Sequence, residues 1–458
     1  MRWPIASGRG WARLPATQAR GHFLSHTAGG FVLKVAVTGL FFVASVALAR
    51  LLGAAGYGAY TYALTWSGLL GLLASLGLGQ LVTRSMAAYQ AQADWGRVKG
   101  LLIWAHGTTL AASLGLALFG ALAAWLWRGA SDQATLLALA LALLLLPLTT
   151  LLRLQQSVLR GFGHVILSQL PESLIQPLLL LVIVGGLWLG LPAGLSAPWA
   201  MAANGTATLG ALGIAVWLAV RCFPQLPAPT AAVYTGRAWL RSALPLLSIS
   251  ALVMVNSRAV ILLLGAMAGV ESVALYNVAA RGAEILSFVL VPTELALQPR
   301  IARLYALGDR AALQEIVRQG ARVMALLALT LVIGLLIFGG QFLRLFGPEF
   351  AGARPALSIL LAGHLCDVLA GPVVIILTMT GHEGDAAKAI GLSTALNLLL
   401  APPLIHVWGL EGAALATAVS LSLWNVLLVF LVRRRVGIDS TLSGKAAPMR
   451  SDPRTIQA

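Results

Sequence analysis

Apolar stretches long enough to cross a lipid bilayer recur along the whole chain, separated by short polar segments. A helix needs about 20 mostly apolar residues to span the hydrocarbon core. The pattern predicts twelve such spans, near residues 31–49, 60–80, 101–127, 134–152, 170–190, 198–220, 242–264, 272–298, 322–340, 356–380, 386–407 and 411–432. The expected fold class is therefore an all-α polytopic membrane protein with almost no soluble domain.

Positive charge is distributed unevenly between the two predicted sides of the membrane. Of the 31 lysines and arginines, three fall inside spans and four in the loops of one side, which are Arg50, Arg128, Arg344 and Arg354. Positive residues resist translocation and collect on the cytoplasmic side. The bias predicts an even number of crossings of a bacterial cytoplasmic membrane, with both termini on the cytoplasmic side. It also explains the net charge of +16 by contact with anionic lipid, not nucleic acid.

The two halves of the chain resemble each other. Tyr60 and Tyr276 lie in similar segments 216 residues apart, and Arg84 and Arg300 follow at the same separation. Each half contains six spans, an even number, so both halves enter the membrane in the same orientation. We therefore expect two six-helix parallel pseudo-repeats, related by an axis along the membrane normal, around a central cavity.

The same pattern divides the chain into segments. Three prolines between the halves indicate a linker. Ala47-Leu48-Ala49 resembles a signal-peptidase site, but the apolar run is long for a signal and cleavage would break the duplication. The expected organisation is a basic cytoplasmic arm (1–30), an N-terminal six-helix lobe (31–220), a cytoplasmic linker (221–241), a C-terminal six-helix lobe (242–432) and a basic cytoplasmic tail (433–458).

Charged residues within the predicted spans are candidates for function, because a charge in the bilayer costs at least a few kcal/mol. Arg258 has no acid nearby in its own helix, and Asn256 is close by. Arg281 and Glu284 are three residues apart, a spacing that allows an ion pair within one helix. Two cations against one acid predict a positive cavity wall that attracts phosphate. Snorkelling of Arg258 and neutralisation of Arg281 by Glu284 are the alternatives.

Other ionisable residues have more ordinary interpretations. Lys34 lies about one turn into the first span, where snorkelling to the headgroups is expected. Glu172 begins the fifth span and is expected to face the cytoplasmic interface. Asp367 and His364 lie near the middle of the tenth span. Asp367 or Glu284 could instead carry a coupling proton or Na⁺.

The sequence carries no signature of an enzyme. It has no Walker loop, no dinucleotide-binding glycine fingerprint and no metal-ligand spacing, and its two cysteines, Cys222 and Cys366, form no framework. The external loops are too short to hold a glycosyl-transfer site. We expect a transporter without a metal site or a cofactor, unless H⁺ or Na⁺ drives it.

Several segments carry a resemblance to a known family over roughly residues 28–436. They are Ala49–Gly53, Tyr57–Tyr60, Leu76–Gly79, Asn256–Arg258, Ala274–Arg281 with Glu284, and Pro299–Tyr305. In these segments the chain resembles the oligosaccharide-lipid flippases of polysaccharide biosynthesis (Wzx-type). That family belongs to the superfamily that also contains MATE drug exporters and lipid II flippases.

The resemblance implies a function and a site. The implied function is alternating access for an undecaprenyl-pyrophosphate-type lipid-linked oligosaccharide, working beside polysaccharide polymerase and export machinery. Arg258 and Arg281 match by position the intramembrane arginines thought to hold the pyrophosphate, with Asn256, Glu284 and Asp367 in supporting or coupling roles. Lys34 is a loose equivalent of an arginine in span one of the lipid II flippases.

Two other functions remain open. A cation-coupled exporter of drugs would need an acidic, aromatic-lined cavity, and the excess of intramembrane cations argues against one. A membrane-embedded glycan polymerase or ligase would need a substantial external loop with catalytic acids or arginines, and none is visible in the sequence.

Overall fold

Helices are the only regular elements in the described part of the chain, which comprises residues 16–126, 132–190, 194–223 and 231–441 of a computed structural model. The first half contains α1 (Ala16–Ala74), α2 (Leu78–Ala91), α3 (Trp95–Leu126), α4 (Gln133–Leu144), α5 (Leu146–Gly161), α6 (Val165–Leu170), the π-helical turn η2 (Pro171–Ile175), α7 (Gln176–Gly190) and α8 (Ala197–Cys222). The second half contains α9 (Gly236–Glu284), α10 (Ser287–Ala306), α11 (Arg310–Arg344), the 3₁₀ turn η3 (Pro348–Ala353), α12 (Arg354–Ala370), α13 (Val373–Met379) and α14 (Glu383–Arg435).

The helices are built to lie in lipid. In the described residues, eight are long and apolar enough to cross a membrane, or nine if α4 and α5, bent by 42°, form one span. Large apolar side chains on their outer faces are exposed, among them Leu118, Phe119, Val182, Leu189 and Val220. Such surfaces are stable in hydrocarbon and unfavourable in water. The chain is an all-α, multi-pass membrane protein, which confirms the predicted fold class.

Glycines break three of the longest helices. Gly53 (φ 68°, ψ 177°), Gly269 (φ 81°, ψ 169°) and Gly409 (φ 53°, ψ −119°) leave the helical conformation inside α1, α9 and α14. Positive φ is accessible to glycine because it has no Cβ. Each break joins two predicted spans in one continuous element, so eight or nine helices correspond to a larger number of predicted spans. The number twelve stays a prediction. So does the pseudo-repeat, although Gly53 and Gly269 share backbone angles at the expected separation of 216 residues.

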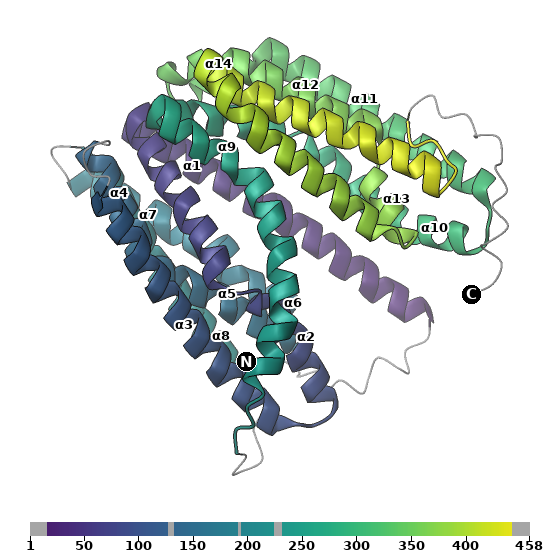
Figure 1. The fold of residues 1–458 in the computed structure, drawn as a ribbon, viewed down its shortest axis with the longest axis horizontal. Coiled ribbons are helices and arrows are strands. Elements are labelled where there is room, and N and C mark those ends of the chain that lie inside the picture. The colour runs from purple at the N-terminus through teal and green to yellow at the C-terminus, as the bar shows by residue number, and fades with distance from the viewer. Residues whose placement is uncertain (1–15, 127–131, 191–193, 224–230, 442–458) are drawn as a thin grey trace.

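The helices form two bundles that meet at one end and diverge toward the other (Figure 1). We call α1–α8 the N-lobe and α9–α14 the C-lobe. The closed end carries Gly53, Gly269 and η3, and the open end carries the α2–α3, α5–α6, α10–α11 and α13–α14 turns. The largest hydrophobic core cluster contains residues of both lobes, including Tyr57 and Phe346. The clusters at the open end are separate, one in the C-lobe and one in the N-lobe with the start of α9.

Small residues bring the lobes into close contact at the closed end. A Cβ on Gly58 would lie 1.8 Å from the carbonyl oxygen of Val270, so α1 and α9 approach there through a glycine. Arg50 Nε donates a hydrogen bond to the Leu345 carbonyl at 2.6 Å. The rings of Tyr57 and Phe350 pack edge to face with centroids 6.2 Å apart. These contacts close that end of the central space.

The start of α9 packs on the N-lobe and not on its own lobe. Trp239 Nε1 donates to the Tyr89 hydroxyl at 3.0 Å, and its ring lies 5.4 Å from that of Trp104. A Cβ on Gly77 would lie 2.4 Å from the Ala243 carbonyl oxygen. Helix α9 therefore crosses from the closed end of the C-lobe to the open end of the N-lobe (Figure 1).

The element boundaries differ from the predicted segments at three places. Helix α1 begins at Ala16, inside the predicted arm 1–30, and residues 1–15 lie outside the described part. Helix α9 begins at Gly236, so the connection after α8 is shorter than the predicted linker 221–241, of which 224–230 are not described. The predicted tail 433–458 is described only to residue 441.

The contact at Gly58 generates a prediction. Replacing Gly58 with Ala places a methyl group against the backbone of α9, and we expect this to destabilise the closed end by about 1–3 kcal/mol. The apparent melting temperature of the purified protein in detergent should fall. Gly107→Ala is the matched control, because a Cβ at Gly107 in α3 meets nothing within 4 Å. Equal melting temperatures for the two variants would contradict the close approach of the lobes.

Candidate functional site

Three adjacent cavities run through the space between the helices. The N-lobe cavity, of about 340 Å³, lies between α1, α5, η2, α7, α8 and α9. The C-lobe cavity, of about 380 Å³, lies between α9, α12 and α14. The open-end cavity, of about 540 Å³, lies between α1, α2, α3, α5 and η2. Arg258, Asn277 and Arg281 line both of the first two, and Arg153 and Glu172 line both the first and the third.

The bend of α9 at Gly269 brings the two predicted arginines together. Arg258 lies eleven residues before this glycine and Arg281 twelve after it, so at 1.5 Å per residue each lies about 17 Å along its segment. Both side chains line the same two cavities. They therefore lie at the seam between the lobes, facing the central space.

Neither arginine forms an ion pair with a carboxylate of the described chain. Among the described residues, Arg258 makes no hydrogen bond or ion pair, and its side chain is exposed to the cavities. Arg281 is half-buried, and its Nε donates to Asn277 Oδ1 at 3.1 Å. Glu284 lines the C-lobe cavity without pairing with Arg281. The ion pair that the i, i+3 spacing allows is not formed, because Asn277, one turn earlier, holds the guanidinium instead.

The other predicted site residues are more scattered. Asn256 and His364 line the C-lobe cavity. Asp367 accepts a hydrogen bond from Asn425 Nδ2 at 2.8 Å and is not among the described residues that line the three cavities. Lys34 belongs to the part of α1 whose side chains are not described. The roles of all these residues, Arg258 and Arg281 included, stay predictions.

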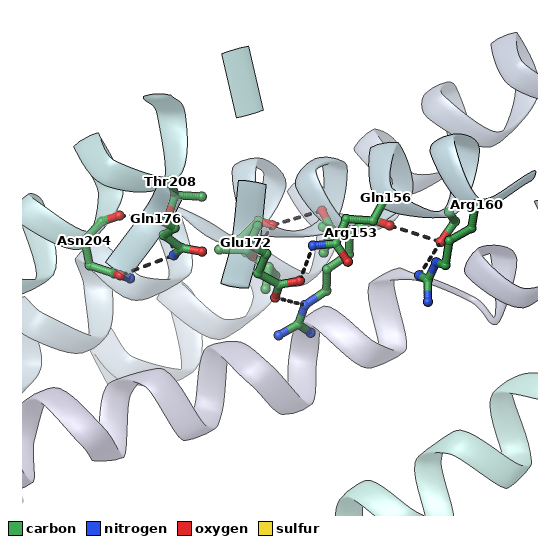
Figure 2. A network of polar contacts seen from close by, with 11 residues as sticks. Arg153, Gln156, Arg160, Glu172, Gln176, Asn204 and Thr208 are labelled. Carbon is green, nitrogen blue, oxygen red and sulfur yellow. Dashed lines mark hydrogen bonds and ion pairs between the residues drawn. The ribbon is translucent and has the colours of Figure 1, made fainter. Parts of the chain in front are cut away.

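A polar network in the N-lobe escaped the sequence analysis (Figure 2). Arg153 Nε lies 3.3 Å from Glu172 Oε1, and Gln156 Nε2 donates to the other carboxylate oxygen. The fourth span was predicted to end at residue 152, which put Arg153 in a loop, but α5 continues to Gly161. Glu172, expected at the membrane interface, lies in the π-helical turn η2 and lines two cavities. The i, i+3 spacing of Arg153 and Gln156 after an apolar run was the available signal.

The charge of the open-end cavity is positive. Arg84, Arg153 and Arg160 line it, and Glu172 is the one acidic residue among its described lining. Farther along the N-lobe, Gln176 Nε2 donates to Thr208 Oγ1 at 2.9 Å (Figure 2). Among the described residues, no three His, Cys, Asp or Glu side chains gather as a metal site. The cavities are suited to an anion.

Comparison with known families agrees with this geometry. The model of a family described as polysaccharide biosynthesis protein matches residues 27–305, more than half of the chain, and the MatE family model matches residues 245–404. The chain belongs to the polysaccharide biosynthesis protein family. This finding supports the resemblance noted in the sequence.

Individual proteins extend the comparison. The chain is 27% identical over 173 residues to the Haloferax volcanii protein named "Probable flippase AglR", a match that spans 37% of this chain and 36% of that relative. An inward-facing multidrug resistance MATE transporter aligns with a TM-score of 0.68 at 15% identity, over 87% of this chain and 94% of that one. The lipid II flippase MurJ in an inward closed conformation aligns at 0.61 and 13% identity, over 88% and 87%. The chain has the fold of these transporters.

The Arg153–Glu172 pair generates a prediction about charge in the cavities. Glu172→Gln keeps the shape of the side chain, replaces one of its two acceptor oxygens with an NH₂ group and removes one negative charge beside Arg153. We expect pyrophosphate to bind the purified protein several times more tightly at low ionic strength, because one unit charge at short range is worth about 1 kcal/mol even in water.

The matched control is Glu315→Gln on α11, where the glutamate also pairs with an arginine, Arg318, but away from the three cavities. Pyrophosphate binding is measured by calorimetry for both variants. Unchanged binding in Glu172→Gln would show that this carboxylate does not limit the anion affinity of the cavities.

Proposed function

We propose that this protein moves an oligosaccharide linked to an undecaprenyl-pyrophosphate-type lipid across the bacterial cytoplasmic membrane for polysaccharide biosynthesis. The observation that carries the proposal is the pair Arg258 and Arg281, which lines both lobe cavities without a carboxylate partner. A guanidinium stays charged in a protein interior and binds phosphate oxygens through two parallel hydrogen bonds. A diphosphate offers oxygens to two such groups at once.

The orientation follows from the positive charges. The loops rich in lysine and arginine lie at the open end, and such loops remain in the cytoplasm. The open end therefore faces the cytoplasm, both termini are cytoplasmic, and the conformation is open to the side where lipid-linked sugars are assembled. Arg84 and Arg160 at the entrance attract the anionic headgroup, and Arg153 leads on to the arginines at the seam.

Transport then requires the two lobes to tilt about the bound headgroup, so that the open end closes and the closed end opens. The lipid tail stays in the bilayer while the diphosphate and sugars occupy the cavities. Contacts at the closed end, such as that between Arg50 and Leu345, break when that end opens. A ligand shifts such an equilibrium only by binding one conformation better than the other. We assign the binding of a coupling H⁺ or Na⁺ to Glu284 or Asp367. For Lys34 we keep the expectation that it lies near the lipid headgroups.

No covalent step is part of this proposal, so the protein acts as a transporter without a catalytic residue or cofactor of its own. The family match supports a role in polysaccharide biosynthesis, and the name of the Haloferax volcanii relative supports a flippase. Polymerase and export machinery would take the product on the outer side. A positive seam disfavours the cationic drugs that a cation-coupled exporter would carry.

Replacing the seam arginines tests the proposal. Arg258→Gln and Arg281→Gln should each reduce the transport of a lipid-linked oligosaccharide by about 10- to 100-fold, because a hydrogen bond to a charged group contributes about 1.5–3 kcal/mol. Export of the polysaccharide is measured in cells, with protein level checked by blotting. Arg434→Gln, an exposed arginine at the end of α14, is the control. Wild-type export in both seam variants would contradict the assignment of Arg258 and Arg281 to pyrophosphate binding. So would a loss of drug resistance in these variants without a loss of polysaccharide export.

A further inference from the structure

The C-lobe cavity has a lining unlike that of the other two. Beside the seam arginines it is lined mainly by uncharged side chains that form hydrogen bonds, including Tyr276, Ser393, Asn397, Thr417, Ser420 and Trp424. Its volume of about 380 Å³ lies within the range of roughly 300–1,000 Å³ found for small-molecule sites. Glu284 is the one acidic residue in its described lining. A mostly uncharged polar chamber next to a cationic seam can hold a group attached to the phosphate.

Three polar atoms of this lining lack partners within the described chain. Asn397 Oδ1, Ser420 Oγ and Trp424 Nε1 are buried and make no hydrogen bond there. Asn397 is 5% exposed and Ser420 is 2% exposed. Large majorities of buried polar atoms are paired in folded proteins. Because their residues line the cavity, a bound molecule can supply the missing partners once the surrounding side chains shift slightly.

Two hydrogen bonds join neighbouring residues of the same cavity. The Tyr276 hydroxyl and Thr417 Oγ1 are 2.8 Å apart, and Ser393 Oγ donates to the Ser420 carbonyl at 3.0 Å. The wall of the cavity is therefore ordered around the three atoms, and their lack of partners does not reflect a loosely packed region. Asn397 lies before the break of α14 at Gly409, and Ser420 and Trp424 lie one turn apart after it, so both arms of the helix contribute.

The three atoms together match a hydroxyl group. An amide oxygen only accepts a hydrogen bond, an indole N–H only donates one, and a serine hydroxyl does both. A sugar hydroxyl likewise donates and accepts. A hard cation such as Ca²⁺ or Mg²⁺ takes oxygen ligands, and the indole of Trp424 cannot supply one. The indole ring instead offers an apolar face with one polar edge, which suits the C–H face of a pyranose.

We propose that the C-lobe cavity is the subsite for the sugar attached to the pyrophosphate, with Asn397, Ser420 and Trp424 bound to its hydroxyl groups. The inference rests on the proposed function, because the seam arginines place the diphosphate beside this cavity. A site that hydrogen-bonds a hydroxyl group strongly rejects an analogue that lacks it. These residues therefore set which first sugar the protein accepts.

Binding of two lipids separates the subsite from the phosphate site. The probes are undecaprenyl pyrophosphate alone and the same lipid carrying one hexose or one N-acetylhexosamine, bound to the full-length protein and measured by native mass spectrometry. Asn397→Leu and Trp424→Phe should each lower the affinity for the preferred sugar-bearing lipid about fivefold to tenfold, the effect of losing one hydrogen bond. The affinity for the bare lipid should not change. Trp408→Phe, on the same helix but 53% exposed, is the control.

The outcomes distinguish the two proposals. Arg258→Gln should lower the affinity for both lipids by the same factor. Unchanged affinities in this variant would contradict the proposed function. The sugar subsite is overturned if wild-type protein binds the bare and sugar-bearing lipids equally, or if Asn397→Leu and Trp424→Phe leave the preference intact. It is also overturned if these variants lower the affinity for the bare lipid as much as the affinity for the sugar-bearing lipid. A loss of Na⁺ binding with an unchanged preference for the sugar-bearing lipid would overturn it as well. The variants should keep their melting temperature, because apolar replacement of an unpaired polar group costs the fold little.

Discussion

Charge inside the membrane without a carboxylate to neutralise it is the constraint on which the rest of this structure depends. Arg258 and Arg281 lie on a helix that must cross hydrocarbon, where an unpaired guanidinium is costly. The fold meets that cost by placing both at the seam of two lobes, where they face cavities and not lipid. Asn277 orients Arg281 without cancelling its charge. Glu172, in contrast, neutralises Arg153 nearer the open end. The two seam arginines therefore keep their charge without a paired carboxylate in the described chain.

The same seam explains why the lobes can move. At the closed end they share a hydrophobic core, a close approach at a glycine and a hydrogen bond from the Arg50 side chain to the Leu345 carbonyl. Toward the open end their cores are separate. Helix α9 belongs to both, since its first turns pack on the N-lobe and its later part lines the C-lobe cavity. Two bundles joined at one end in this way can rock about a central site, and the shared core at the closed end is what must separate. The glycine breaks in α1, α9 and α14 lie where each helix bends.

Much of this architecture could be predicted from the sequence, because apolar runs of spanning length and the asymmetry of lysine and arginine are direct consequences of the membrane. Arg258 and Arg281 stood out for the same reason. Arg153 was missed because polar residues follow the apolar run of its helix, and the run alone does not show that α5 continues to Gly161. Asn397, Ser420 and Trp424 were missed because neutral residues in a span carry no charge signal. Their convergence depends on the bend of α14 at Gly409.

The sequence left open whether Arg281 and Glu284 neutralise each other, since the spacing allows the pair but a competing partner, Asn277, lies one turn away. The structure decides that point in favour of a positive seam. The most direct measurement is an experimental structure of the protein with a bound polyprenyl pyrophosphate. The account predicts the two phosphate groups between Arg258 and Arg281, with their oxygens within hydrogen-bonding distance of both guanidinium groups. A diphosphate bound elsewhere, with the two arginines turned toward lipid or toward carboxylates, would contradict it.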